Sequence, residues 1–181
     1  LQNWNDGLAS YRSIKIDGEI PFAEMKNIKF EYDLKWRMNT LSDENGEPYL
    51  FNLTKGKHTL KLEVAAGPMG TVLKGLSDSV LQLNGLYRNI IMVTGVSPDK
   101  FRTYYLEESI PGLLDSMKEV KANLDELYKS IESITGTGGS QASVVLEMSV
   151  MLGQFIKKPL SVSSRVSAFK DTIESLGSVI L

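Results

Sequence analysis

The feature that most constrains this chain is a change in the spacing of its apolar residues near Gly67. Before that glycine, apolar residues recur at every second position, which is the period of a strand with one face on a core. After it they recur in steps of three and four, which is the period of an amphipathic helix. The sequence therefore predicts an α+β protein, with a β segment over residues 1–66 and a helical segment over residues 67–181.

Four short alternating sets predict the strands of the first segment. They are Ile14 and Ile16; Ile28, Phe30 and Tyr32; Tyr49, Phe51 and Leu53; and Leu60, Leu62 and Val64. Strands of this length, separated by turn signals such as Asp17-Gly18 and Lys55-Gly56, are typical of an antiparallel sandwich. Four or five strands are too few for a complete jelly roll. We therefore expect a short antiparallel β-sandwich-like segment, a partial jelly roll, and the sequence leaves open whether strands from elsewhere complete it.

Breaks in the helical pattern predict where the helices of the second segment begin and end. A first apolar stripe starts after Gly67-Pro68 and ends near Gly95. Ser97-Pro98-Asp99 predicts a new helix start, because a serine cap, a proline in the first turn and an early acid each favour one. Pro111 is expected to kink or restart that helix, because proline lacks the backbone N–H that a helix interior uses.

The remaining helices have the most regular pattern in the sequence. One seam steps by four and three along Leu113, Met117, Val120, Leu124, Leu127, Ile131 and Ile134. After a glycine-rich loop, a stripe of Val144, Met148, Leu152 and Phe155 precedes Pro159, and a last stripe runs from Val162 to Ile180. Such seams are typical of helices that pack nearly side by side. Short connections favour antiparallel neighbours, so we expect an antiparallel bundle of about four helices.

Composition excludes several classes of function. The 181 residues carry a formal net charge of -2, which gives no general attraction to nucleic acid or to an anionic membrane. The chain has no cysteine, so disulfides and thiol chemistry are excluded. No apolar run approaches the ~20 residues of a transmembrane helix. The chain opens on Leu1 and stops within a helical pattern, so we expect a longer protein with flanking segments and its own targeting signal.

Neither a catalytic constellation nor a metal or cofactor motif is found. His58 is the only histidine, and nothing in the sequence identifies a nucleophile and an acid that converge on it, so we expect a packing or hydrogen-bonding role. The acidic run at 43–47 lacks the ligand spacing of a calcium loop and is interpreted as a solvated turn. There is no HExxH motif and no phosphate-binding glycine motif. The sequence predicts a non-enzymatic protein without metal or cofactor.

Aromatic residues of the β segment are the candidate binding residues. Trp4, Trp36 and Tyr49 are interspersed with polar side chains. Exposed rings bind the apolar faces of sugars, while neighbouring polar groups bind the hydroxyls. The alternative is that the rings fill the core of the sandwich. That alternative is favoured for Tyr49, whereas the two interpretations are evenly balanced for Trp36, which is flanked by Lys35 and Arg37.

Three runs of the β segment resemble a known family. They are residues 17–22 (Asp-Gly-Glu-Ile-Pro-Phe), 46–51 (Gly-Glu-Pro-Tyr-Leu-Phe) and 55–64 (Lys-Gly-Lys-His-Thr-Leu-Lys-Leu-Glu-Val). The last run is similar to the Gly-x-His-x-Leu-x-Leu strand of galactose-binding-like jelly rolls and many carbohydrate-binding modules. Together they resemble a module of the extracellular solute-binding proteins of carbohydrate ABC transporters, in which a β-sandwich-like module with a helical insertion accompanies a two-lobed receptor. That receptor core is absent from these residues.

The resemblance implies a non-catalytic module of a carbohydrate-uptake receptor at the cell surface, anchored to the membrane as a lipoprotein. Such a module would bind glycan weakly, with Trp36, Tyr49 and Trp4 as candidate contacts, or would position the receptor against its ABC permease or the cell wall. The alternative is a structural or protein-interaction helical module with no small-molecule ligand. The regular seam from Leu113 to Ile134 favours this alternative as readily.

Overall fold

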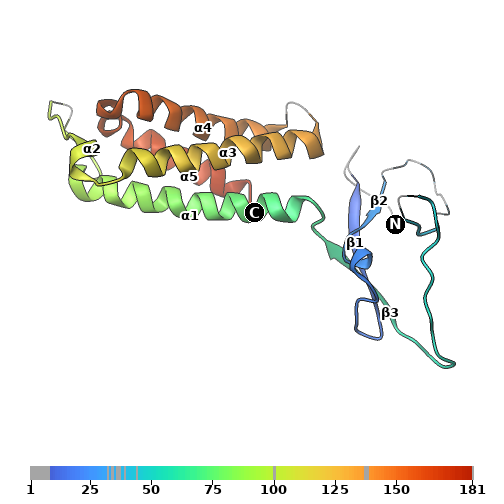
Figure 1. Cartoon of the computed structure of the whole chain (residues 1–181). Coiled ribbons are helices and arrows are strands. Elements are labelled where there is room, and N and C mark those ends of the chain that lie inside the picture. The colour runs from blue at the N-terminus through green and yellow to red at the C-terminus, as the bar shows by residue number, and fades with distance from the viewer. Residues whose placement is uncertain are drawn as a thin grey trace. The chain divides into compact units, whose positions relative to one another are not determined.

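The computed structural model describes residues 9–31, 33, 35, 38, 40–43, 45–99, 101–136 and 139–180. The chain divides into two compact units, Leu1–Pro68 and Met69–Leu181. The first unit contains a small antiparallel sheet, and the second is helical (Figure 1). The predicted α+β class is therefore confirmed.

A three-stranded sheet forms the frame of the N-terminal unit. Its strands are β1 (Ser10–Ile16), β2 (Ile28–Phe30) and β3 (Leu60–Ala65), in the order β2-β1-β3 with both pairs antiparallel. The register sets Ile14 opposite Leu62. Residues that lie opposite each other in an antiparallel pair project from the same face, so β1 and β3 share one apolar face.

The core of this unit is small. The short 3-10 helix η1 (Ala23–Lys26) supplies Met25, which is buried with Ile14 of β1 and Ile28 of β2. Half-buried apolar residues pack around these three, namely Ile20, Phe22, Phe30, Leu41, Tyr49 and Phe51. β3 contributes no member to this cluster. The second layer therefore lies over β1 and β2.

Two strand predictions for this unit are wrong. Residues 49–53 form no strand, and the nearest ladder contact is a single bridge between Ser42 and Pro48. The apolar residues of β3 do not face a core, since Leu60 is 63%, Leu62 44% and Val64 81% exposed. The rings of Tyr49 and Phe51 instead pack against the cluster of Ile14, Met25 and Ile28, to which β3 contributes no residue. Over the described residues a single sheet is present, so the predicted jelly roll is not shown.

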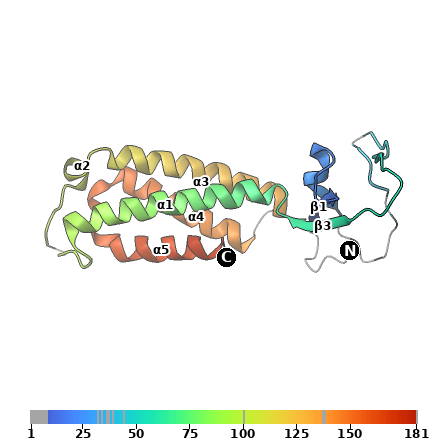
Figure 2. The same cartoon turned by 90° about the horizontal axis from the view of Figure 1, so that it is seen from below.

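Four long helices form the second unit. They are α1 (Met69–Thr94), α3 (Leu113–Thr135), α4 (Ser140–Lys157) and α5 (Val166–Ser178). A short helix α2 (Leu106–Ser109) and two 3-10 turns, η2 (Pro159–Ser161) and η3 (Ser163–Arg165), lie in the connections. Each long helix packs against two others, α1 and α4 both contacting α3 and α5, and successive long helices run in opposite directions (Figure 2). The predicted antiparallel four-helix bundle is confirmed.

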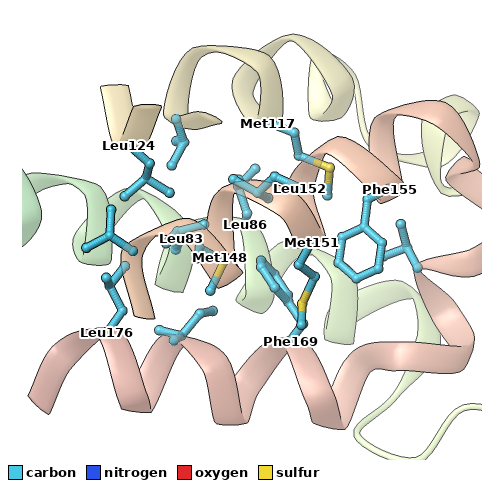
Figure 3. Close-up of a cluster of buried hydrophobic side chains, with 14 of the residues drawn as sticks. Leu83, Leu86, Met117, Leu124, Met148, Met151, Leu152, Phe155, Phe169 and Leu176 are labelled. Atoms are coloured by element: carbon cyan, nitrogen blue, oxygen red, sulfur yellow. The ribbon is translucent and has the colours of Figure 1, made fainter. Parts of the chain in front are cut away.

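The predicted seams fill the centre of this bundle. Leu113, Met117, Val120, Leu124 and Ile131 of α3 are each at most 2% exposed. They meet Leu83 and Leu86 of α1, Met148, Met151, Leu152 and Phe155 of α4, and Phe169 and Leu176 of α5 in one continuous cluster (Figure 3). Phe155 and Phe169 pack edge to face with ring centroids 5.6 Å apart. Heptad spacing thus predicted both the helices and their buried faces.

The helix expected to start at Ser97 does not form. Between Gly95 and Tyr105, the described residues contain no helix. The Asp99 carboxylate accepts the N–H of Phe101 at 2.9 Å, and the Asp99 N–H donates to the Tyr104 hydroxyl at 2.9 Å. The short side chain of aspartate can either cap a helix or close a local turn, and Asp99 closes a turn here. Tyr105 then adopts a left-handed backbone, with φ 44°, which delays the next helical turn to Leu106.

Candidate functional site

Tyr49 is the one sequence-predicted binding residue that the structure describes. Its ring is half-buried and lies 5.4 Å from the ring of Phe22, tilted by 43°. Its backbone N–H donates to the carbonyl of Leu41 at 2.9 Å. The ring belongs to the small core of the N-terminal unit, which is the role favoured for it. Trp4 and Trp36 lie outside the described residues.

A hollow of about 330 Å³ opens beside this aromatic cluster. Phe22 stacks on Phe51 there, with centroids 5.4 Å apart and ring planes 25° apart. The lining comprises Ile16, Glu19, Pro21, Phe22, Leu50, Phe51, Asn52 and Leu53. Its volume is at the lower end of the range for small-molecule sites. This lining combines aromatic and aliphatic side chains with the polar Glu19 and Asn52, and such a mixture fits a small ligand that has an apolar face and hydroxyl groups.

The sequence does not predict most of this lining. The alternating pattern predicts a strand at Phe51, and Phe22 belongs only to a run that resembles the carbohydrate modules. Neither pattern indicates that the two rings meet, because they are far apart in the sequence. The available signal was the clustering of Leu50, Phe51 and Leu53 around the polar Asn52, which suits a ligand-lining segment as well as a strand.

His58 forms a clip with the turn that follows β1. Its Nδ1 lies 2.6 Å from a carboxylate oxygen of Asp17, and its Nε2 lies 2.9 Å from the carbonyl oxygen of Thr54. The other Asp17 oxygen accepts the N–H of Thr59 at 2.8 Å. Both ring nitrogens thus face acceptors, and neither faces a hydroxyl or thiol nucleophile. The arrangement is a hydrogen-bonded clip, as predicted, and lacks the geometry of a catalytic triad.

The clip favours the charged forms of both side chains. The hydrogen bond with Asp17, and then that with the Thr54 carbonyl, raise the pKa of His58 above its usual 6.5. The hydrogen bond with His58, and then that from the Thr59 backbone, lower the pKa of Asp17 below 3.8. Only the imidazolium ion can donate from both nitrogens at once. The geometry and the pKa shifts therefore agree on a protonated histidine beside an ionised aspartate.

The described residues of the acidic run at 43–47 form a turn. One Asp43 carboxylate oxygen accepts the N–H groups of Asn45 and Glu47, each at 2.9 Å. Gly46 supplies the left-handed backbone of the turn, with φ 85°. Among the described residues, no group of three or more His, Asp or Glu side chains is placed to hold a metal ion.

A polar link joins two helices of the bundle. Lys121 of α3 donates to Asp125 at 2.6 Å and to the hydroxyl of Ser149 on α4 at 3.2 Å, and that hydroxyl also donates to Asp125. Partial burial pushes the pKa of Asp125 upward, but the hydrogen bonds from Lys121 and Ser149 outweigh it and leave the pKa lowered. Every member has a partner, so we assign this triad to the registration of α4 on α3.

The exposed face of α4 carries a second hollow, of about 360 Å³. Leu146 and Val150 line it and are 41% and 49% exposed. Glu147 and Arg165 flank them, and the Arg165 guanidinium lies over the ring of Phe155, 5.3 Å from its centroid. This face was also missed from the sequence. Its signal was a pair of apolar residues four apart, outside the stripe expected to be buried.

Comparison with known proteins identifies the helical unit. Residues 71–180 match the family model described as "Bacterial solute-binding protein, 4-helix bundle domain". No curated protein and no solved structure matches the chain. In the part of the chain that the structure describes, no helix is long and apolar enough to cross a membrane. The matched residues form more than half of the chain and coincide with the observed bundle, so the chain belongs to the bacterial solute-binding proteins that carry a four-helix bundle domain.

Proposed function

We propose that this chain is a non-catalytic module of an extracytoplasmic solute-binding protein for carbohydrate uptake, and that its N-terminal unit contacts the sugar. The observation that carries the proposal is the hollow lined by the rings of Phe22 and Phe51, with the polar residues Glu19 and Asn52 also in its lining. Bacterial solute-binding proteins typically act outside the cytoplasm and deliver a ligand to a transporter. A carbohydrate fits the hollow because a sugar ring combines an apolar face with hydroxyl groups.

The site residues proposed from the sequence remain candidates in this proposal. Tyr49 supports the hollow from behind, since its ring packs on Phe22. Trp36 and Trp4 are further candidate contacts in the same unit. We assign no cofactor and no catalytic residue to the protein. Its partners in this proposal are a carbohydrate, and an ABC permease or the cell wall, at a membrane to which a lipoprotein anchor holds the full-length protein.

Calorimetric titration of the chain with a panel of neutral oligosaccharides tests the sugar contact. We expect weak binding that Asn52→Ala and Glu19→Gln each reduce several-fold, because both side chains are exposed at the hollow and their loss removes hydrogen bonds to hydroxyls. Asn89→Ala on α1 and Glu24→Gln on η1 are matched controls at exposed positions away from the hollow. Heat changes absent across the panel, or equal losses in the controls, would contradict the proposal.

Tryptophan fluorescence tests the remaining candidates. The chain has two tryptophans, so Trp4→Phe leaves Trp36 as the only indole, and Trp36→Phe leaves Trp4. A sugar that stacks on an indole changes its emission, and the variant that retains the contacting ring keeps the change. If calorimetry detects a sugar and neither indole responds, the contact is restricted to the hollow and the two tryptophans are not ligands.

A second candidate function is a protein-interaction module without a small-molecule ligand. The exposed Leu146 and Val150 on α4 favour it, because an apolar patch flanked by charges suits a protein contact. Leu146→Lys and Val150→Lys would then weaken binding to the purified permease, whereas Leu81→Lys, at a 66% exposed apolar residue of α1, would not. Retention of sugar binding in all three variants would separate the two functions.

We also propose that residues 1–66 and 67–181 are separate folding domains. The two spacings change at this boundary, and the matched family model begins at residue 71, within the helical segment. Each segment has its own buried cluster, and the two clusters share no residue. Independent unfolding transitions of the two segments would support this division, and a single transition for both would contradict it.

A further inference from the structure

In the part of the chain that the structure describes, no strand pairs with the outer edge of β3. Among the described residues, β3 pairs with β1 alone, and the order β2-β1-β3 places it at the edge of the sheet. The N–H of Asp17 donates to the carbonyl of Thr59 at 2.9 Å, so Thr59 directs its backbone groups toward β1. Backbone direction alternates along a strand. Leu60, Leu62 and Val64 therefore direct their N–H and C=O groups outward, away from β1.

The same three residues present apolar side chains to solvent. Leu60, Leu62 and Val64 are 63%, 44% and 81% exposed and project from one face of the sheet. The opposite face of β3 carries Lys61 and Glu63. An edge with free hydrogen-bonding groups and an exposed apolar row is a template for a further strand, because an added strand satisfies both.

We propose that the occupant of this edge is β3 of a second copy of the chain, paired antiparallel about a two-fold axis at Leu62. In this register Leu62 lies opposite Leu62 of the other copy, and Leu60 lies opposite Val64. Every outward backbone group of these residues then meets a partner in the correct hydrogen-bonding phase. The two apolar rows also fall on the same face of the extended sheet.

Charge selects this register over its neighbours. With the axis at Leu62, Lys61 of each copy lies opposite Glu63 of the other, which places two attractive pairs on the polar face. A shift of the axis by one residue toward the N-terminus sets Lys61 against Lys61. A shift toward the C-terminus sets Glu63 against Glu63. Opposite charges across strands stabilise a pair and like charges destabilise it, so the sequence of β3 is complementary to itself in one register.

The present neighbours of Glu63 are compatible with this pairing. Glu63 contacts Lys15 of β1 and Lys61 of its own strand, each at 2.6 Å. Hydrogen bonds from these two lysines lower its pKa to about 2, so the carboxylate is ionised throughout the working pH range. Lysine on an edge strand commonly prevents edge pairing. Here the alternating glutamate reverses that effect, because each exposed lysine meets an acid of the other copy.

The predicted assembly is a closed dimer with a six-stranded sheet in the order β2-β1-β3-β3-β1-β2. The two-fold axis pairs the β3 edge of one copy with the β3 edge of the other, so this contact does not propagate into a filament. One strand pair buries less surface than a standard stable interface. We therefore expect a reversible dimer that populates at high concentration, and its formation does not depend on the proposed sugar contact.

Sedimentation velocity of the whole chain, from about 1 to about 500 µM, covers the range in which such weak dimers form. We expect the wild type to approach the dimer mass as concentration rises. Lys61→Glu and Glu63→Lys should each remain monomeric at concentrations where the wild type dimerises, because each makes both cross-strand pairs repulsive. An equimolar mixture of the two variants should dimerise again, because a strand with two acids on its polar face then pairs with a strand that has two lysines there.

Leu62→Lys provides a second disruption that leaves the Lys15–Glu63 pair in place. Its matched control is Leu81→Lys, which adds the same charge at a 66% exposed residue of α1. Circular dichroism confirms the fold of each variant before sedimentation. A monomer at every concentration, a dimer that Leu81→Lys disrupts and Leu62→Lys does not, or a mixture of charge variants that stays monomeric would overturn the proposal.

Discussion

The two units of this protein stabilise themselves in different ways. The helical unit buries one continuous apolar cluster to which all four long helices contribute. Among its described residues, the N-terminal unit buries three apolar side chains, Ile14, Met25 and Ile28, and leaves the apolar row of β3 in solvent. Since stability scales with buried apolar area, the bundle is expected to be self-sufficient and the sheet to be marginal. The bundle is therefore held by contacts within its own unit, whereas the sheet has few such contacts to stabilise it.

The largest expected effect is in the bundle. Phe155→Ala removes a fully buried ring that packs on Phe169 and should destabilise the helical unit by about 3–5 kcal/mol. Thermal or urea unfolding followed by circular dichroism at the helical band measures the change. Leu146→Ala, on the same helix but 41% exposed, is the control and should cost less than half as much. Equal losses in both variants would show that the observed core does not determine stability.

A substitution in the N-terminal unit with a somewhat smaller loss of stability should unfold that unit completely. Met25→Ala removes a side chain that is 0% exposed and leaves two buried residues in the cluster, at a cost of about 2–5 kcal/mol. A marginal unit cannot absorb that loss, so the N-terminal unit should unfold while the helical transition keeps its midpoint. Limited proteolysis followed by mass analysis would locate the cleavages within residues 9–68. A parallel shift of the helical midpoint would contradict the independence of the two units.

Sequence predicted the bundle well because its information is local. The seven-residue seam of α3 identifies both the helix and the face that it buries, and its neighbours follow through short connections. The misplaced start at Ser97 is instructive, since the same aspartate that caps a helix also closes a turn. Local propensity does not distinguish the two outcomes. The packing of Tyr104 and the backbone of Tyr105 decide between them.

Sequence predicted the sheet less well because its contacts are not local. Alternation at Tyr49, Phe51 and Leu53 is equal to that of β3, yet these residues form no strand and Phe51 packs on Phe22. No periodic signal predicts such a contact between distant rings. The exposed row of β3 is the converse case, because its alternation correctly predicts a strand and wrongly predicts that its apolar face is covered. The hollow depends on the contact between Phe22 and Phe51, which the periodic pattern does not predict.

Substitution of Gly67, at the end of the sheet, tests the packing of the sheet with a smaller expected loss of stability. A Cβ added at Gly67 would lie 2.5 Å from the ring of Tyr11, and its backbone is left-handed with φ 57°. Gly67→Ala should destabilise the N-terminal unit by about 1–3 kcal/mol through overpacking and backbone strain. Gly85→Ala in α1 should have the opposite sign, with a gain of up to about 1 kcal/mol, since nothing lies near its Cβ. Amide exchange in each unit would measure the two effects separately.

The smallest expected effect is a dependence of the sheet on pH, through the clip between His58 and Asp17. His58 has a raised pKa, so its contribution to stability is fully present below 6.5 and is lost as pH rises through the folded value. Asp17 has a lowered pKa, so its contribution is present above 3.8 and is lost as pH falls through its folded value. The clip should therefore be strongest between these limits. The helical unit contains no histidine, so its transition should show no matching loss as pH rises through the folded pKa of His58.

The single histidine makes this prediction direct to measure. One imidazole resonance titrates in the whole chain, and its midpoint should lie above 6.5. Asp17→Asn keeps the shape of the partner but removes its charge, so the midpoint should move down toward 6.5 and the pH dependence of the N-terminal unit should weaken. Lys57→Gln, at an exposed residue beside His58, is the control for a general change of charge. If Lys57→Gln moves the midpoint as far as Asp17→Asn does, the pKa shift of His58 comes from the surrounding charges and not from the clip. The pH dependence of the sheet would then need a source other than the contact between His58 and Asp17.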